Sequence, residues 1–162
     1  MSRLGKKVGF IGCVSQDQMG DYCVEYFNNE GIDTSHVVRA KGGESLGLAF
    51  TEILDKDTSR LIMYRDNVAD LKLEPGDVDE EYIKSAKMLI ISGTALSQSP
   101  SREAALKAMA YARKNGTAWC STSTTGPIHG KIKTKSHSTI RQRPPWRISS
   151  WAPGRNTTSP TR

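Results

Sequence analysis

The sequence predicts an α/β fold for residues 1–118, followed by a disordered tail over residues 119–162. Two continuously apolar runs, residues 7–12 and 87–92, have the composition of parallel strands that are buried on both faces. Each run is followed by turn residues and then by apolar side chains that recur at helical spacing. The length of 162 residues fits one domain of ordinary size and leaves little room for a second.

The first strand, over residues 7–12, and the helix after it make half of a βαβ unit. Ser15 is predicted to cap this helix, because Gln18 follows three residues later, at the spacing of a capping box. Gly31 supplies the stop. The apolar face of the helix is predicted to consist of Met19, Cys23, Tyr26 and Phe27.

Three β-prone segments come next, at residues 35–40, 46–54 and 60–64, with turn-forming sequences between them. Parallel neighbours need a long crossover connection, and no helical pattern separates these segments. They are therefore predicted to form an antiparallel meander, a flap over about residues 35–65 that projects from the α/β body. Flaps of this kind often act as lids over a cleft.

The second α/β unit begins with a short helix over residues 78–86, for which Asp77 is the predicted cap. The apolar strand over residues 87–92 follows it, and a longer helix then runs to Gly116. The strand expected after Gly116 is predicted to be missing, since the apolar pattern stops there. The inward face of the longer helix is predicted to consist of Leu106, Met109 and Ala110.

Charge and composition change abruptly at Trp119. All 17 acidic residues precede it, whereas 8 of the 23 basic residues follow it, so the net charge of +6 belongs to the tail. Residues 119–162 also hold 15 Ser or Thr residues and 5 of the 7 prolines. Such a composition cannot bury enough apolar surface to offset chain entropy, which is why disorder is predicted.

Two interpretations of this basic tail stay open. Cations interleaved with stacking rings are typical of proteins that bind single-stranded nucleic acid or polyanions without enzymatic activity. The abrupt onset inside a βαβ unit instead indicates out-of-frame translation without a specific nucleic-acid partner, which the other reading frames of the coding DNA would show. The interleaved residues are Arg141, Arg143, Trp146, Arg147, Trp151 and Arg155.

Other signals in the sequence are negative. The first apolar run ends at Ser15, far short of the roughly 18 residues that span a membrane, so a cytoplasmic protein without a membrane partner is predicted. The three cysteines share no CxxC spacing and the three histidines lie far apart, so neither a disulfide framework nor a metal site is indicated. The common nucleotide-binding and hydrolase motifs are absent, and no cofactor-binding residue is assigned.

One cluster, residues 64–67 at the end of the predicted flap, has the chemistry of a binding site. Arg65 beside the hydroxyl of Tyr64 can bind a carboxylate or sugar hydroxyls, because its planar fork matches carboxylate geometry. The alternative is a solvated strand end with an ordinary ion pair, which contributes little.

Several segments resemble a known family. Residues 3–12 (RLGKKVGFIG), 17–20 (DQMG) and 29–35 (NEGIDTS) are similar to the amino-terminal region of ribokinase-type carbohydrate kinases. Residues 47–53 (GLAFTEI), 63–70 (MYRDNVAD), 92–97 (SGTALS) and 99–104 (SPSREA) are similar to members that act on keto-sugar acids. The resemblance covers about residues 3–118 and implies a Rossmann-like three-layer body closed by a small β-sheet lid.

The resemblance also implies an activity and a set of site residues. Intact members transfer the γ-phosphoryl group of ATP, with Mg²⁺, to the terminal hydroxyl of a sugar. The resemblance further implies that Tyr64 and Arg65 reach the keto-sugar acid, and that Leu48 and Phe50 on the matching lid strand cover it. These four are the predicted substrate-binding residues. Some members pair through their lids, which leaves a homodimer open.

Two departures limit what the chain is expected to do. The family begins about fifty residues earlier and continues well past residue 118, so a partial kinase domain over residues 1–118 is predicted. The family's Gly-Ala-Gly-Asp motif, which supplies the general base and the anion hole, is not in this sequence. No catalytic residue is therefore assigned, and the chain is predicted to be inactive and to bind ATP and Mg²⁺ poorly.

Overall fold

The structure, a computed structural model, describes residues 1–122. The predicted tail from residue 123 onward, with its interleaved Arg and Trp residues, lies outside the described residues. Single 3₁₀ turns occur at Ser2–Leu4, Ala69–Leu71, Pro75–Asp77 and Gly93–Leu96. In chain order the longer elements are β1 (Val8–Val14), α1 (Gln18–Asn29), β2 (Ile32–Arg39), β3 (Leu48–Ile53), β4 (Ser59–Tyr64), α2 (Glu80–Ser85), β5 (Met88–Ile91), α3 (Ser101–Asn115) and β6 (Ala118–Ser121).

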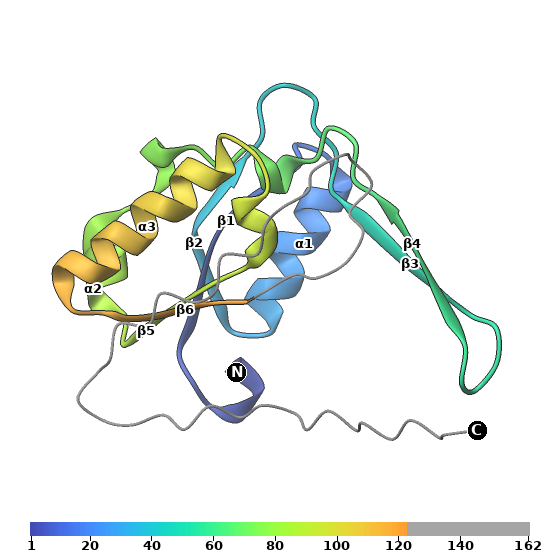
Figure 1. The fold of residues 1–162 in the computed structure, drawn as a ribbon, viewed down its shortest axis with the longest axis horizontal. Coiled ribbons are helices and arrows are strands. Elements are labelled where there is room, and N and C mark those ends of the chain that lie inside the picture. Colours follow the sequence, from blue (N-terminus) through green and yellow to red (C-terminus); the bar gives the residue numbers. More distant parts are fainter. Residues whose placement is uncertain (123–162) are drawn as a thin grey trace, which may run out of the picture.

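The strands form three pairs. β1 pairs in parallel with β2 and β5 pairs in parallel with β6, while β3 and β4 form an antiparallel hairpin. Helix α1 connects the first parallel pair and α3 connects the second, as parallel pairing requires. The hairpin extends away from the body (Figure 1). The predicted α/β class with a small projecting lid is therefore confirmed.

The predicted three-stranded meander is wrong in its first strand. Residues 35–40 fall almost entirely within β2, which pairs with β1 in the body, with Cys13 opposite Val38. The helix before this segment decides its partner, because α1 provides the crossover that places β2 parallel to β1. The lid is therefore the two-stranded hairpin β3–β4, spanning residues 48–64.

The strand predicted to be missing after α3 is present. β6 pairs with β5 in the register Leu89↔Trp119, and it includes the first three residues of the predicted tail. A β ladder joins backbone N–H and C=O groups, so the polar side chains of Cys120 and Ser121 do not prevent it. Regular structure thus continues to Ser121 rather than ending at residue 118.

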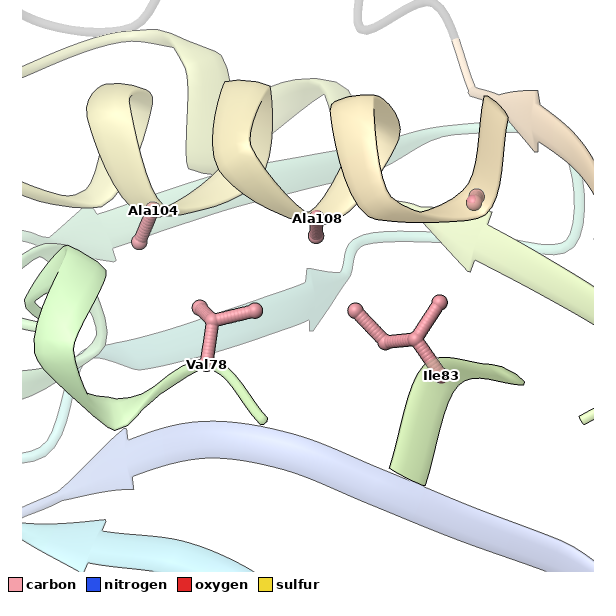
Figure 2. Packing of buried hydrophobic residues seen from close by; sticks show 5 residues of the cluster. Val78, Ile83, Ala104 and Ala108 are labelled. Carbon is pink, nitrogen blue, oxygen red and sulfur yellow. The ribbon is translucent and has the colours of Figure 1, made fainter. Parts of the chain in front are cut away.

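The main core lies between α3, α2 and the segment before α2 (Figure 2). The predicted inward face of α3 is wrong for Leu106 and Ala110, which are exposed, whereas Met109 is half-buried. Small side chains face inward instead, which allows α3 to approach its neighbours closely. The buried cluster consists of Val78, Ile83, Ala104, Ala108 and Ala112. One face of β5 is likewise uncovered within the described residues, where Met88 and Ile90 are exposed.

Both predicted helix caps are displaced by two residues. Asp17, not Ser15, caps α1 by accepting a hydrogen bond from the Gly20 amide at 3.0 Å, and the hydroxyl of the fully buried Ser15 donates to Asp17. Hydrogen bonds from Ser15 and from Gly20 lower the pKa of Asp17. Asp79, not Asp77, caps α2 through the Tyr82 amide at 3.0 Å.

Helix α2 is tied to the sheet by Tyr82. Its hydroxyl donates to Oδ2 of Asp33 at 2.8 Å, and its ring stacks on His36 with the centroids 3.7 Å apart. The hydroxyl passes so close to β1 that a Cβ on Gly9 would lie 1.8 Å from it. Gly9 therefore provides the space in which Tyr82 reaches β2.

We expect Tyr82→Phe to lower the free energy of unfolding by about 1–2 kcal/mol at pH 7, because a hydrogen bond to a carboxylate is lost. Burial and the bond to Asp33 raise the pKa of Tyr82 from 10.0 to about 12. A raised pKa stabilises the fold fully below pH 10, and this stabilisation is lost as the pH rises to about 12. Urea unfolding at several pH values measures the difference.

The matched control for this change is Tyr22→Phe, because the Tyr22 ring is exposed and the structure records no hydrogen bond from its hydroxyl to a described residue. Its effect should stay within about 0.5 kcal/mol at every pH. An equal loss of stability in the two variants at pH 7 would contradict the role assigned to Tyr82.

Candidate functional site

Three of the four predicted substrate-binding residues share one face of the lid. Leu48 lies opposite Tyr64 in the hairpin, and Phe50 is two residues further along β3. The rings of Phe50 and Tyr64 meet edge to face, with centroids 5.8 Å apart. Phe50 is 54% exposed and Tyr64 61% exposed. The lid thus presents aromatic side chains that no other described part of the chain covers.

The alternation of side chains along the hairpin strands explains why these residues share one face. Side chains two residues apart on a strand point to the same side, so Leu48 and Phe50 are together on β3. The hairpin is closed by a turn in which the Asp57 amide donates to Asp55 Oδ1 at 2.8 Å, and this hydrogen bond lowers the pKa of Asp55. The turn sets the register that places Leu48 opposite Tyr64.

Arg65, the fourth predicted residue, does not join this face. It directly follows Tyr64, the last residue of β4. Its Nη2 donates to Oδ2 of Asp70 at 2.6 Å, and its side chain is only 19% exposed. The strand end is therefore not a solvated pair with the adjacent Asp66. Asp70 lies within segment 63–70, but it was not predicted from the sequence as the partner of Arg65.

The root of the lid is attached to the body beside this ion pair. Ser45 and Val68 form a parallel bridge, and the Ala69 amide donates to the Ser45 carbonyl at 2.9 Å. Ala69 is fully buried and packs with Cys13 and Ala40 at the ends of β1 and β2. Because Ala69 and Asp70 belong to the same 3₁₀ turn, the carboxylate that holds Arg65 is carried by the body.

Two titratable groups near the lid root have shifted pKa values. Hydrogen bonds from its own amide and from the Gly42 amide, the latter at 2.7 Å, lower the pKa of Glu44, and Lys72 Nζ lies 3.7 Å from its Oε1. Burial raises the pKa of Cys13 to about 11, so its thiol stays protonated at neutral pH. Glu44 is thus an ionised group that fixes the loop before the lid, and Cys13 is a core residue.

Residues 1–122 contain no group of three or more His, Cys, Asp or Glu side chains placed to hold a metal ion. Among the same residues, no helix combines the length and the apolar character that crossing a membrane requires.

The α/β body with a hairpin lid is the architecture of the ribokinase-like class, and comparisons with known proteins agree. Residues 1–135 match the family described as pfkB family carbohydrate kinase. This match covers more than half of the chain, and the chain belongs to the pfkB family.

Two similar curated proteins share one name. The chain is 62% identical over 117 residues to the 5-dehydro-2-deoxygluconokinase of Clostridium botulinum (strain Alaska E43 / Type E3), and the match covers 72% of the chain and 34% of that protein. It is also 62% identical over 117 residues to the 5-dehydro-2-deoxygluconokinase of Geobacillus kaustophilus (strain HTA426), of which 35% is covered. The chain thus spans about a third of the length of these relatives.

Solved structures show the same fold. A PfkB protein from Polaromonas sp. JS666 aligns with a TM-score of 0.66 at 30% identity, over 74% of this chain and 40% of that one. A putative ribokinase II from E. coli in complex with ATP and Mg²⁺ aligns with a TM-score of 0.65 at 28% identity, over 74% and 38%. The predicted ribokinase-like fold is therefore confirmed for the described residues.

Proposed function

We propose that this chain is the lid-bearing, sugar-binding part of a kinase that transfers the γ-phosphoryl group of ATP to 5-dehydro-2-deoxygluconate, a keto-sugar acid of inositol catabolism in the cytoplasm. The names of the relatives support this choice of substrate. The observation that carries the proposal is the exposed lid face of Leu48, Phe50 and Tyr64 with Arg65 at its root.

Each of these residues has a distinct part in the proposal. Leu48 and the two aromatic rings cover the apolar side of the sugar and exclude water from it. Arg65 at the lid root receives the carboxylate, because a guanidinium has five N–H donors and its pair with Asp70 uses one of them. Binding of the substrate at the root then couples to closure of the lid over the body.

ATP, with Mg²⁺, would supply the phosphoryl group that is transferred. The related E. coli structure contains both. The family resemblance assigns the general base and the anion hole to a motif absent from this sequence. No step of the transfer is therefore derived from the described residues, and the proposal for them concerns binding of the sugar acid. That the chain by itself is inactive stays a prediction, which an assay for ATP-dependent phosphorylation of the sugar acid by the purified chain tests.

Isothermal titration of the purified chain with 5-dehydro-2-deoxygluconate tests the proposal. We expect Arg65→Ala to weaken binding by about 10- to 100-fold, since one charge-assisted contact is worth roughly 1.5–3 kcal/mol. Arg113→Ala, at an exposed position on α3, removes the same charge and should change the affinity less than twofold. The proposal would be refuted if the two variants bound the sugar acid with equal affinity, or if the unaltered chain did not bind it.

A homodimer through the lid stays a prediction. The face of the hairpin opposite the candidate site is also apolar, with Ile53, Leu61 and Met63 exposed. A contiguous exposed apolar surface of this kind is typical of a protein contact. Sedimentation velocity of the chain would show whether it pairs.

A further inference from the structure

We infer that Asp70 is a positioning residue for Arg65, and that Gly47 provides the space in which the guanidinium is held. This inference rests on the proposed function, in which Arg65 binds the carboxylate of the sugar acid. It adds two residues that do not touch the substrate themselves but determine where the charged contact is made.

The first observation is the ion pair. Nη2 of Arg65 lies 2.6 Å from Oδ2 of Asp70, and Arg65 is the only hydrogen-bond partner recorded for the Asp70 side chain among the described residues. The second oxygen, Oδ1, is buried with no partner among those residues. A carboxylate placed there does not cap a helix or close a turn, so its role in this part of the chain is to hold Arg65.

The second observation is the space above Gly47. A Cβ built on Gly47 would lie 3.2 Å from Nη1 of Arg65 and 3.4 Å from Cγ1 of Val68. The distance to Val68 is at the short limit of ordinary van der Waals contact, but the distance to Nη1 is tighter than that, so a methyl group would move the guanidinium by a few tenths of an ångström. Gly47 precedes the lid strand β3, and Arg65 follows the lid strand β4. The guanidinium therefore crosses the root of the hairpin.

The third observation is that Asp70, which holds Arg65, is attached to the body and not to the lid. Ala69, next to Asp70, is fully buried in the body, and its amide is bonded to Ser45. The carboxylate therefore has a fixed place, whereas a free arginine side chain samples many rotamers. The single bond through Nη2 fixes the group and leaves Nη1 and Nε, which make no recorded hydrogen bond to another described residue, for the ligand.

The sign of the effect separates positioning from simple electrostatics. Removing a negative charge near a bound carboxylate should strengthen binding or leave it unchanged. If Asp70 positions Arg65, its removal should weaken binding instead. Asp66→Asn is the matched control, because this exposed carboxylate adjoins Arg65 in the chain and has no recorded ion pair with a described residue.

Isothermal titration of the full chain with 5-dehydro-2-deoxygluconate tests this. We expect Asp70→Asn to weaken binding about tenfold, Asp70→Glu to restore part of the affinity, and Asp66→Asn to bind as tightly as the unaltered chain or slightly more tightly. Gly47→Ala leaves every charge in place and should weaken binding about threefold. An affinity of Asp70→Asn equal to or above that of Asp66→Asn would overturn the inference.

The methyl ester of the sugar acid distinguishes positioning from a general structural role. The ester lacks the negative charge, so Asp70→Asn should change its affinity less than about twofold. A loss equal to that measured with the acid would mean that Asp70 merely supports the lid, and would overturn the inference.

A separate measurement keeps the inference distinguishable from the proposed function. An Nη2–H resonance of Arg65 in the NMR spectrum should be visible in the unaltered chain and should exchange rapidly in Asp70→Asn, because Nη2 is the group that donates to Asp70. If the chain binds neither acid nor ester, the proposed function fails, while loss of this resonance in Asp70→Asn still supports the positioning role. A resonance that is unchanged by Asp70→Asn would overturn that role.

Discussion

Gly20→Ala is expected to lower the free energy of unfolding by about 2–4 kcal/mol, an effect near the upper end for a single methyl group. A Cβ at this position would lie 2.0 Å from the Ser15 carbonyl oxygen and 2.7 Å from Nη1 of Arg39. The same carbonyl accepts a hydrogen bond from Arg39 Nη1 at 2.9 Å, and Ser15 is fully buried. The first turn of α1 would therefore have to move off the end of β1.

The clash outweighs what alanine contributes to the helix. Alanine in place of glycine inside a helix is favourable by about 1 kcal/mol, but the atom in the way here belongs to the backbone and cannot rotate aside. Gly76→Ala is the matched control, because nothing lies within 4 Å of its Cβ position, and it should be neutral within about 0.5 kcal/mol. Equal urea midpoints for the two variants would contradict the close approach of α1 to Ser15.

Ile83→Ala is expected to cost about 2–5 kcal/mol of unfolding free energy, because it opens a cavity in the main core. Ile83 is 1% exposed and packs with Val78 against the alanine face of α3 (Figure 2). The alanines at positions 104, 108 and 112 have no side-chain rotamers with which to fill the space. The cavity would therefore relax only partly.

Ile53→Ala is the same chemical change at an exposed site, since Ile53 on the lid is 78% exposed. At protein concentrations where the chain is monomeric, it should alter the free energy of unfolding by less than about 0.5 kcal/mol. Urea unfolding followed by far-ultraviolet circular dichroism measures both variants. If Ile83→Ala were no more destabilising than Ile53→Ala, the core assigned to α2 and α3 would be wrong.

The candidate site was only partly predictable from the sequence. The period of two in the β-prone segments is enough to place Leu48 and Phe50 on one face, and the short turn after Ile53 places Tyr64 across from Leu48. Periodicity carries no information about which carboxylate meets Arg65. Arg65 meets Asp70 because the chain turns at Val68 and Ala69 to enter the body, and this turn depends on tertiary contacts.

The same distinction applies to the fold: some of its features have local causes in the sequence, and others have non-local causes. Apolar runs, glycine stops and turn sequences were sufficient for an α/β body with a small lid, because hydrophobic periodicity and turn chemistry act over a few residues. The partner of β2, the existence of β6 and the alanine face of α3 depended on segments far apart in the chain. Strand pairing follows the crossover helix, and the buried face of a helix follows the surface it packs against, so only the tertiary structure decided them.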